Sequence, residues 1–223
     1  MGRVKRIYGY LYKMRDGVIR IRTDEPDYSA LPVQEFDWAR SVYGDVSEIL
    51  PKDAPIPLGK YVTLTDYFDA NLYHDMVTGR SVTGILHLVN KSPMDWFSKK
   101  QETVETATYG AEFIAARTCV DQAIDFRNTL RYMGVPVRER SYMFGDNKSV
   151  IDSSSHPHAK LHKRQNVLSF HRVREAIASK FLAIYYLPGE LNPADILSKH
   201  WGYQQIWKLL QPILFYSGDT TDL

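Results

Sequence analysis

Four acidic residues that lie far apart in the sequence could together hold divalent metal ions: Asp69, Glu112, Asp146 and Asp195. Carboxylate oxygens are the ligands that Mg²⁺ and Mn²⁺ prefer, and two such ions about 4 Å apart can flank a phosphodiester. One ion would lower the pKa of the attacking water, and the other would stabilise the leaving 3′ oxygen. The four acids therefore predict a two-metal site for phosphodiester hydrolysis, provided that the fold brings them to one edge of a sheet.

Each of these residues also has an ordinary structural explanation. Glu112 extends the inward-facing stripe of a predicted helix, but near the helix N-terminus it could be exposed and favoured by the helix dipole. Asp146 fits a simple Asp–Asn turn, and Asp195 fits the first turn of a helix. Asp69 has a rival, Asp66, on the same predicted strand. Taken one at a time, none of the four identifies a metal site.

Periodic patterns over residues 60–216 predict the elements that would carry these acids. Strands are expected at 61–68, 82–89, 94–98, 141–144 and 181–187, and helices at 108–133, at 160–179 and from residue 192 onward. The inward stripe of the first of these helices comprises Ala116, Cys119, Ala123, Phe126, Leu130 and Met133. Three strands followed by alternating helices and strands predict an α/β fold, an antiparallel meander continued by parallel strands in one mixed five-stranded sheet. Asp69 and Asp146 would each end a strand of this sheet.

The remaining residues divide by composition. Residues 1–22 predict a short helix over 5–12 and a strand over 18–22. Residues 23–59 are acidic and hold five of the eleven prolines, which predicts a connecting segment with little regular structure. Residues 60–216 form the predicted main domain, which a helix over 203–216 would close, and residues 217–223 are a tail.

Composition excludes several classes of protein. The single cysteine, Cys119, rules out an internal disulfide framework and a cysteine-rich zinc site. No apolar run reaches the roughly 20 residues of a membrane span, and the N-terminus lacks a signal-peptide core. We expect an intracellular protein without a membrane partner, in the cytoplasm, the nucleus or a virus-like particle.

Six short motifs follow one another in order over residues 60–202. They start at Asp69 (DANLYHD, with GRSVTG from Gly79), Trp96 (WFSKKQ), Thr106 (TATYGAEF), Phe144 (FGDNKS), Phe170 (FHRVRE) and Asn192 (NPADILSK). This ordered set resembles the ribonuclease H domain of copia-type retrotransposons. The resemblance implies a ribonuclease H-like fold and an endonuclease that cuts the RNA strand of RNA–DNA hybrids during reverse transcription, using two Mg²⁺ or Mn²⁺ ions.

The resemblance also assigns roles to particular residues. It selects Asp69 over Asp66, so that the catalytic and metal-binding set is Asp69, Glu112, Asp146 and Asp195. The segment from Lys5 to Leu11 is similar to the end of the reverse transcriptase that precedes this domain, which makes residues 1–22 a remnant of that enzyme and the reverse transcriptase of the same polyprotein a partner.

Basic residues that could contact the phosphates of a hybrid are Arg80, Lys99, Lys100, Lys160, Lys163, Arg164, Arg172 and Arg174. A solvated helix face explains the last five equally well. The sequence departs from the family pattern at Asn71, which replaces an acidic residue, and at Gln165, which replaces a histidine. His162 and His171 are auxiliary substitutes for that histidine, although helix packing or phosphate contact explains each of them. The spacing of His156, His158 and His162 also allows a zinc site.

An alternative function uses the same fold without catalysis. Asn71 and Gln165 favour this alternative, a nucleic-acid-binding or scaffolding module with weak or no nuclease activity. Four retained carboxylates favour the nuclease, because clustered acids are costly without a compensating cation.

Overall fold

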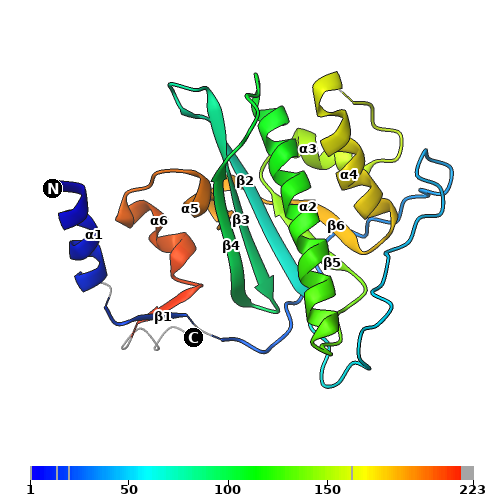
Figure 1. The fold of residues 1–223 in the computed structure, drawn as a ribbon, viewed down its shortest axis with the longest axis horizontal. Helices are drawn as coiled ribbons and strands as arrows, with labels where there is room; N and C mark the ends of the chain where they lie inside the picture. The colour runs from blue at the N-terminus through cyan, green and yellow to red at the C-terminus, as the bar shows by residue number, and fades with distance from the viewer. Residues whose placement is uncertain (1, 14, 20, 162, 217–223) are drawn as a thin grey trace.

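The computed structural model describes residues 2–13, 15–19, 21–161 and 163–216, and its centre is a five-stranded sheet (Figure 1). The strands are Leu64–Asp75 (β2), Arg80–Val89 (β3), Ser92–Lys100 (β4), Ser141–Gly145 (β5) and Leu182–Tyr186 (β6). They lie in the order β4-β3-β2-β5-β6. The first three pair antiparallel, whereas β5 runs parallel to both β2 and β6. The predicted mixed sheet, an antiparallel meander continued by parallel strands, is confirmed.

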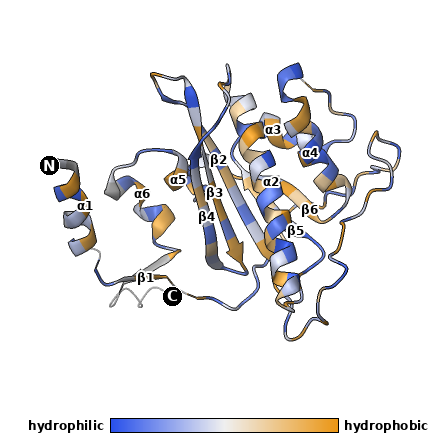
Figure 2. Ribbon diagram, in the orientation of Figure 1, coloured by the Kyte–Doolittle hydropathy of each residue, from blue (hydrophilic) through white to orange (hydrophobic). Residues whose placement is uncertain are grey.

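The long helix Thr108–Tyr132 (α2) packs along one face of this sheet (Figure 1). Four of the six residues predicted to face inward are buried, namely Ala116, Cys119, Ala123 and Leu130. Phe126 is half-buried, and Met133 lies past the last turn with 72% of its surface exposed. In Figure 2 the ribbon of α2 carries hydrophilic and hydrophobic residues in turn, as a helix with one buried and one exposed side requires.

The region after Asp146 differs from the prediction. A helix that was not predicted, Lys148–Ser155 (α3), follows β5, and the side chain of Asn147 caps it by accepting a hydrogen bond from the backbone N–H of Val150. The predicted helix over 160–179 begins only at Val167 (α4, Val167–Ala178), after a 3₁₀ turn over Arg164–Asn166. Pro157 lacks a backbone donor, and the described residues between α3 and this turn are not helical.

Strand β2 continues well beyond Asp69, so the prediction that Asp69 ends a strand is wrong. The hairpin with β3 extends this strand, since Asp69 pairs with Gly84 and the pairing continues, after a bulge, to Asp75 and Arg80. Asp146, in contrast, directly follows β5 as predicted. Asp69 therefore lies in the middle of a paired strand, and the residues before and after it also pair with β3.

Residues 23–59 contain no helix or strand among the described residues, yet they pack against the sheet and its helices. Trp38 is buried, and the Tyr28 hydroxyl lies 2.7 Å from the Thr65 hydroxyl. The Glu48 carboxylate accepts hydrogen bonds of 2.7 to 2.9 Å from Arg127 and Arg131. Burial acts to raise the pKa of Glu48, but these two guanidinium groups outweigh it and lower the pKa. We propose that this segment belongs to the folded unit rather than merely connecting two parts.

The two ends of the described chain meet in a small second sheet. Gly17–Ile19 (β1) pairs antiparallel with Leu214–Tyr216 (β7), and the helix Gly2–Lys13 (α1) lies apart from the central sheet (Figure 1). The predicted helix over 203–216 ends at Leu210 (α6, Tyr203–Leu210), because the chain turns there into β7. In the described part of the chain, no helix combines the length and the apolar character that crossing a membrane requires.

Candidate metal centre

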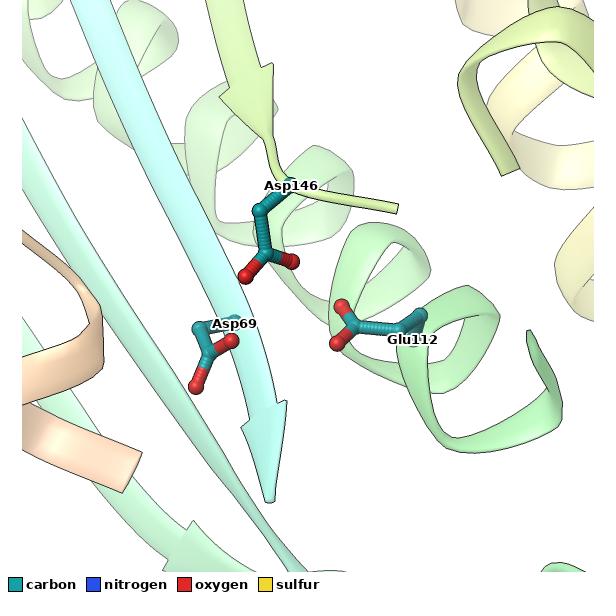
Figure 3. Close-up of side chains that lie close together, drawn as sticks. All are labelled: Asp69, Glu112 and Asp146. Carbon is teal, nitrogen blue, oxygen red and sulfur yellow. The ribbon is translucent and has the colours of Figure 1, made fainter. Parts of the chain in front are cut away.

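Three of the four predicted acids converge at one end of the parallel strand pair (Figure 3). Asp69 comes from β2, Asp146 from the end of β5, and Glu112 from the N-terminal part of α2. Carboxylate oxygens of the three lie within 4.8 Å of one another. Glu112 is 4% exposed, so the explanation that placed it in solvent at the helix edge is wrong. Asp146 faces the other two acids rather than serving only a turn.

One oxygen of Glu112 has no hydrogen-bond donor among the described residues. Its Oε1 accepts from the backbone N–H of Ala70 at 3.3 Å, whereas its Oε2 is buried and unpartnered. Burial, and then the charges of Asp69 and Asp146, raise the pKa of Glu112 well above its usual value. Burial and the charge of Asp69 also raise the pKa of Asp146. A divalent cation fits this arrangement, because it would give Glu112 Oε2 a partner and neutralise the mutual repulsion.

Asp195 reaches this region on the short helix Asp195–Ser198 (α5), which packs closely on β3. Gly84, opposite Asp69 in the hairpin, makes this approach feasible: a Cβ there would lie 2.5 Å from the carbonyl oxygen of Ala194. The Asn192 side chain ties the same turn to β2 by donating to the backbone oxygen of Phe68 at 2.9 Å. A glycine and an asparagine therefore bring α5 next to Asp69.

The carboxylate of Asp195 lies beside Asp69 but contacts a lysine. Lys199 Nζ donates to Asp195 Oδ1 and lies 3.4 Å from Asp69 Oδ1, and the Ser198 hydroxyl donates to Asp69 Oδ2. Burial raises the pKa of Asp195 to about 6, and Asp69 adds to this while Lys199 opposes it. Burial acts to lower the pKa of Lys199, but Asp69, Asp195 and Asp146 outweigh it and raise the pKa. Neither Lys199 nor Ser198 was predicted to be a site residue, although the spacing of four between Asp195 and Lys199 predicts their contact.

Asp66, the rival of Asp69, belongs to a different cluster. It is fully buried, with Oδ1 2.6 Å from His87 Nδ1, and the other ring nitrogen of His87 lies 3.1 Å from Gln122 Oε1. Residues three apart on a strand point to opposite faces, so Asp66 and Asp69 serve different sides of β2. The structure thus places Asp69 with Glu112 and Asp146, and Asp66 in the core beneath α2.

The three converging acids line a surface depression of about 450 Å³. Its lining also includes Asn71 and Lys199. Asp195 is absent from this lining and instead borders a separate, larger cavity of about 820 Å³. The depression leads from the surface to Asp69, Glu112 and Asp146.

The predicted phosphate-binding residues differ greatly in exposure. Arg174 is 3% exposed, and its guanidinium donates to the backbone oxygens of Ser153, His156 and Pro157 at 2.7 Å each. Its Cζ also lies 5.0 Å from the centre of the Trp38 ring. The prediction that Arg174 contacts phosphate is wrong, because every one of these contacts is internal to the fold.

The other basic residues are accessible to different degrees. Arg172 pairs with Asp121 at 2.7 Å, Lys100 pairs with Asp75 at 2.8 Å, and Lys163 donates to the hydroxyl of Thr106 at 3.2 Å. Arg80, Lys99, Lys160 and Arg164 are exposed. Their contact with nucleic acid remains a prediction.

Of the two histidines suggested as auxiliary groups, the structure describes only His171, which is not at the acids. His171 is exposed on α4, and its Nδ1 lies 2.7 Å from the Tyr43 hydroxyl. His162 lies outside the described residues, and so does the zinc site suggested for His156, His158 and His162, which requires it. His156 Nδ1 lies 2.9 Å from the backbone oxygen of Asp152, as expected for a histidine at a helix end. Gln165 donates to Glu105 Oε2 at 2.8 Å.

Comparison with known proteins relates this chain to a retrotransposon polyprotein. Over 136 residues, 61% of the chain, it is 29% identical to the retrovirus-related Pol polyprotein from transposon TNT 1-94 of Nicotiana tabacum. The aligned part is 10% of that polyprotein, so the chain corresponds to about a tenth of its relative. No family model matches the chain.

Solved structures similar to this chain include two ribonucleases H1. The enzyme from the halophilic archaeon Halobacterium salinarum NRC-1 is 15% identical, with a TM-score of 0.48 over 62% of this chain and 95% of that one. LC11-RNase H1 in complex with an RNA/DNA hybrid is 16% identical, with a TM-score of 0.49 over 60% of this chain and 93% of that one. The order and directions of the strands in the sheet are those that the sequence resemblance to ribonuclease H implies.

Proposed function

We propose that this chain, which carries a ribonuclease H-like domain related to the Pol polyprotein of transposon TNT 1-94, hydrolyses the RNA strand of RNA–DNA hybrids. The observation that carries the proposal is the convergence of Asp69, Glu112 and Asp146, three buried or half-buried carboxylates whose oxygens lie within 4.8 Å of one another. Such a cluster is costly unless cations compensate it. Two Mg²⁺ or Mn²⁺ ions are the proposed cofactors.

The protein's part in this reaction would be to hold the ions and the substrate in the correct relative positions. Asp69, Glu112 and Asp146 would be ligands of the ions, and Glu112 Oε2 is free to bind because no described residue donates to it. When bound, the ions supply an activated water and stabilise the leaving oxygen. Asp195 would contribute from α5, next to Asp69. The pairing of Asp69 with Gly84 of β3 would keep its backbone in place while the substrate binds.

The substrate class follows from the relationship to a retrotransposon polyprotein and from the surface of the domain. Reverse transcription produces RNA–DNA hybrids, and a ribonuclease H grips such a duplex through its backbone and its 2′-hydroxyls with little sequence preference. The exposed residues Arg80, Lys99, Lys160 and Arg164 are the proposed phosphate contacts. The reverse transcriptase of the same polyprotein is the proposed partner, in the cytoplasm, the nucleus or a virus-like particle.

Cleavage of matched duplexes tests this proposal. The full chain with Mg²⁺ or Mn²⁺ should cut the RNA strand of an RNA–DNA hybrid and leave RNA–RNA and DNA–DNA duplexes of the same sequence intact. Chelation of the metal should stop the reaction. Equal cleavage of all three duplexes would contradict the substrate class, and binding of the hybrid without cleavage at any metal concentration would favour the non-catalytic module.

A further inference from the structure

Two consecutive residues, Ser198 at the end of α5 and Lys199 directly after it, contact the two carboxylate oxygens of Asp69. The Ser198 hydroxyl donates to Oδ2, and the ammonium of Lys199 lies 3.4 Å from Oδ1. The same ammonium donates to Asp195 Oδ1. A positive charge from the chain itself therefore lies between Asp69 and Asp195, where an ion that these two acids share would have to bind.

The two sides of Asp69 consequently differ. On one side, Asp69, Glu112 and Asp146 line the open depression, which Lys199 also borders, and no described residue donates to Glu112 Oε2. On the other side, the Lys199 ammonium contacts both Asp69 and Asp195, and Asp195 borders a different cavity. On the first side a buried carboxylate oxygen is left for a divalent ion to bind, whereas on the second side the ammonium already contacts both acids.

We infer that Lys199 is a built-in counter-cation that controls the number of metal ions the site holds. Without nucleic acid, the chain binds one divalent ion, between Asp69, Glu112 and Asp146, and the second ion binds between Asp69 and Asp195 only after Lys199 moves out. This inference rests on the proposed function, because it concerns the same metal centre. It assigns Lys199 a positioning role, through the acids rather than through the reacting atoms.

Lys199 is suited to such a movement. It lies at the C-terminal end of α5, four residues after Asp195, and about a third of its side chain is exposed. A lysine has a flexible stem, so its ammonium can swing into solvent without disturbing the packing of α5 on β3. A phosphate of the bound hybrid would offer the ammonium a new partner at the rim of the depression, which would couple arrival of the second ion to substrate binding.

Calorimetric titration of the full chain with Mn²⁺, in the absence of nucleic acid, tests the inference. The unchanged chain should bind one ion, whereas Lys199→Met should bind two. The affinity of Lys199→Met for a second ion should be at least about tenfold higher than that of the unchanged chain, because removal of a unit charge a few ångströms away strengthens cation binding. Lys199→Arg keeps the charge and should still bind one. Electron paramagnetic resonance should show coupled Mn²⁺ pairs only in Lys199→Met, since the two sites share Asp69.

A second lysine provides the matched control. Lys100→Met removes a lysine that pairs with Asp75, outside the acid cluster, and should still bind one ion. Two ions on the unchanged chain, or one ion on a folded Lys199→Met chain, would overturn the role of Lys199 and leave the proposed nuclease intact. Failure of every variant and of the unchanged chain to bind Mn²⁺ would overturn the metal centre itself, and the proposed function with it.

Discussion

Asp146→Asn should lower the rate of cleavage of a hybrid's RNA strand roughly a thousandfold or more. A metal ion at such a site contributes several kcal/mol of transition-state stabilisation, and each 1.4 kcal/mol is about a factor of ten in rate. Asparagine has nearly the shape of aspartate but lacks the charge that would hold the ion. Single-turnover cleavage of a labelled hybrid measures the effect directly.

The same substitution should stabilise the metal-free chain. The pKa of Asp146 is raised in the folded protein by burial and by Asp69, so its charged form is disfavoured on folding and stability falls as the pH rises through that pKa. Asp146→Asn removes this penalty at neutral pH, and the melting temperature without metal should rise. Asp75→Asn is the matched control, because Asp75 lies on β2 but pairs with Lys100. Undiminished cleavage by a folded Asp146→Asn chain would contradict the role of this acid.

Arg174→Met should lower the free energy of unfolding by about 3–5 kcal/mol, because a backbone oxygen left without its donor costs about 1–3 kcal/mol and this side chain serves three. The variant leaves the backbone oxygens of Ser153, His156 and Pro157 without this donor, the first in a buried and the other two in a partly buried setting. For a protein of this size the melting temperature should fall by about 10 °C. Chemical denaturation monitored by tryptophan fluorescence provides the measurement.

Arg172 offers a control two residues away on the same helix. Its side chain is 38% exposed and pairs with Asp121 and Glu175 at the surface, so Arg172→Met should change stability by no more than about 1 kcal/mol. If Arg174 instead contacted phosphate, Arg174→Met would weaken binding of the hybrid and leave stability unchanged. That pattern would contradict the structural role.

The local signals of the sequence were sufficient for α2 and for the order of the strands. A helix of this length, with buried residues such as Cys119 and Ala123 at helical spacing, is specified by its own sequence. The length of β2 is not, because pairing with β3 decides where the strand ends and so places Asp69 in its middle. The prediction of a helix over 160–179 was also partly wrong. The Asn147 side chain caps a separate helix, α3, before this region, and Pro157 lies between α3 and the helix that begins at Val167.

The acids of the site could be predicted, but their neighbours could not. Glu112 stands out in sequence because it extends an apolar stripe, and burial confirms that signal. The contact of Lys199 with Asp69 and the close approach at Gly84 depend on residues far apart in the chain, which no local pattern encodes. The same holds for the contacts of Glu48, because the proline-rich composition of residues 23–59 predicted only a connecting segment.

Anomalous diffraction from crystals of the full chain soaked with Mn²⁺ tests the metal centre most directly. We expect a peak bonded to oxygens of Asp69, Glu112 and Asp146 at roughly 2.0–2.3 Å, the range for hard divalent cations on carboxylates. The absence of a peak between these three side chains at saturating Mn²⁺, in crystals where they remain together, would contradict the account.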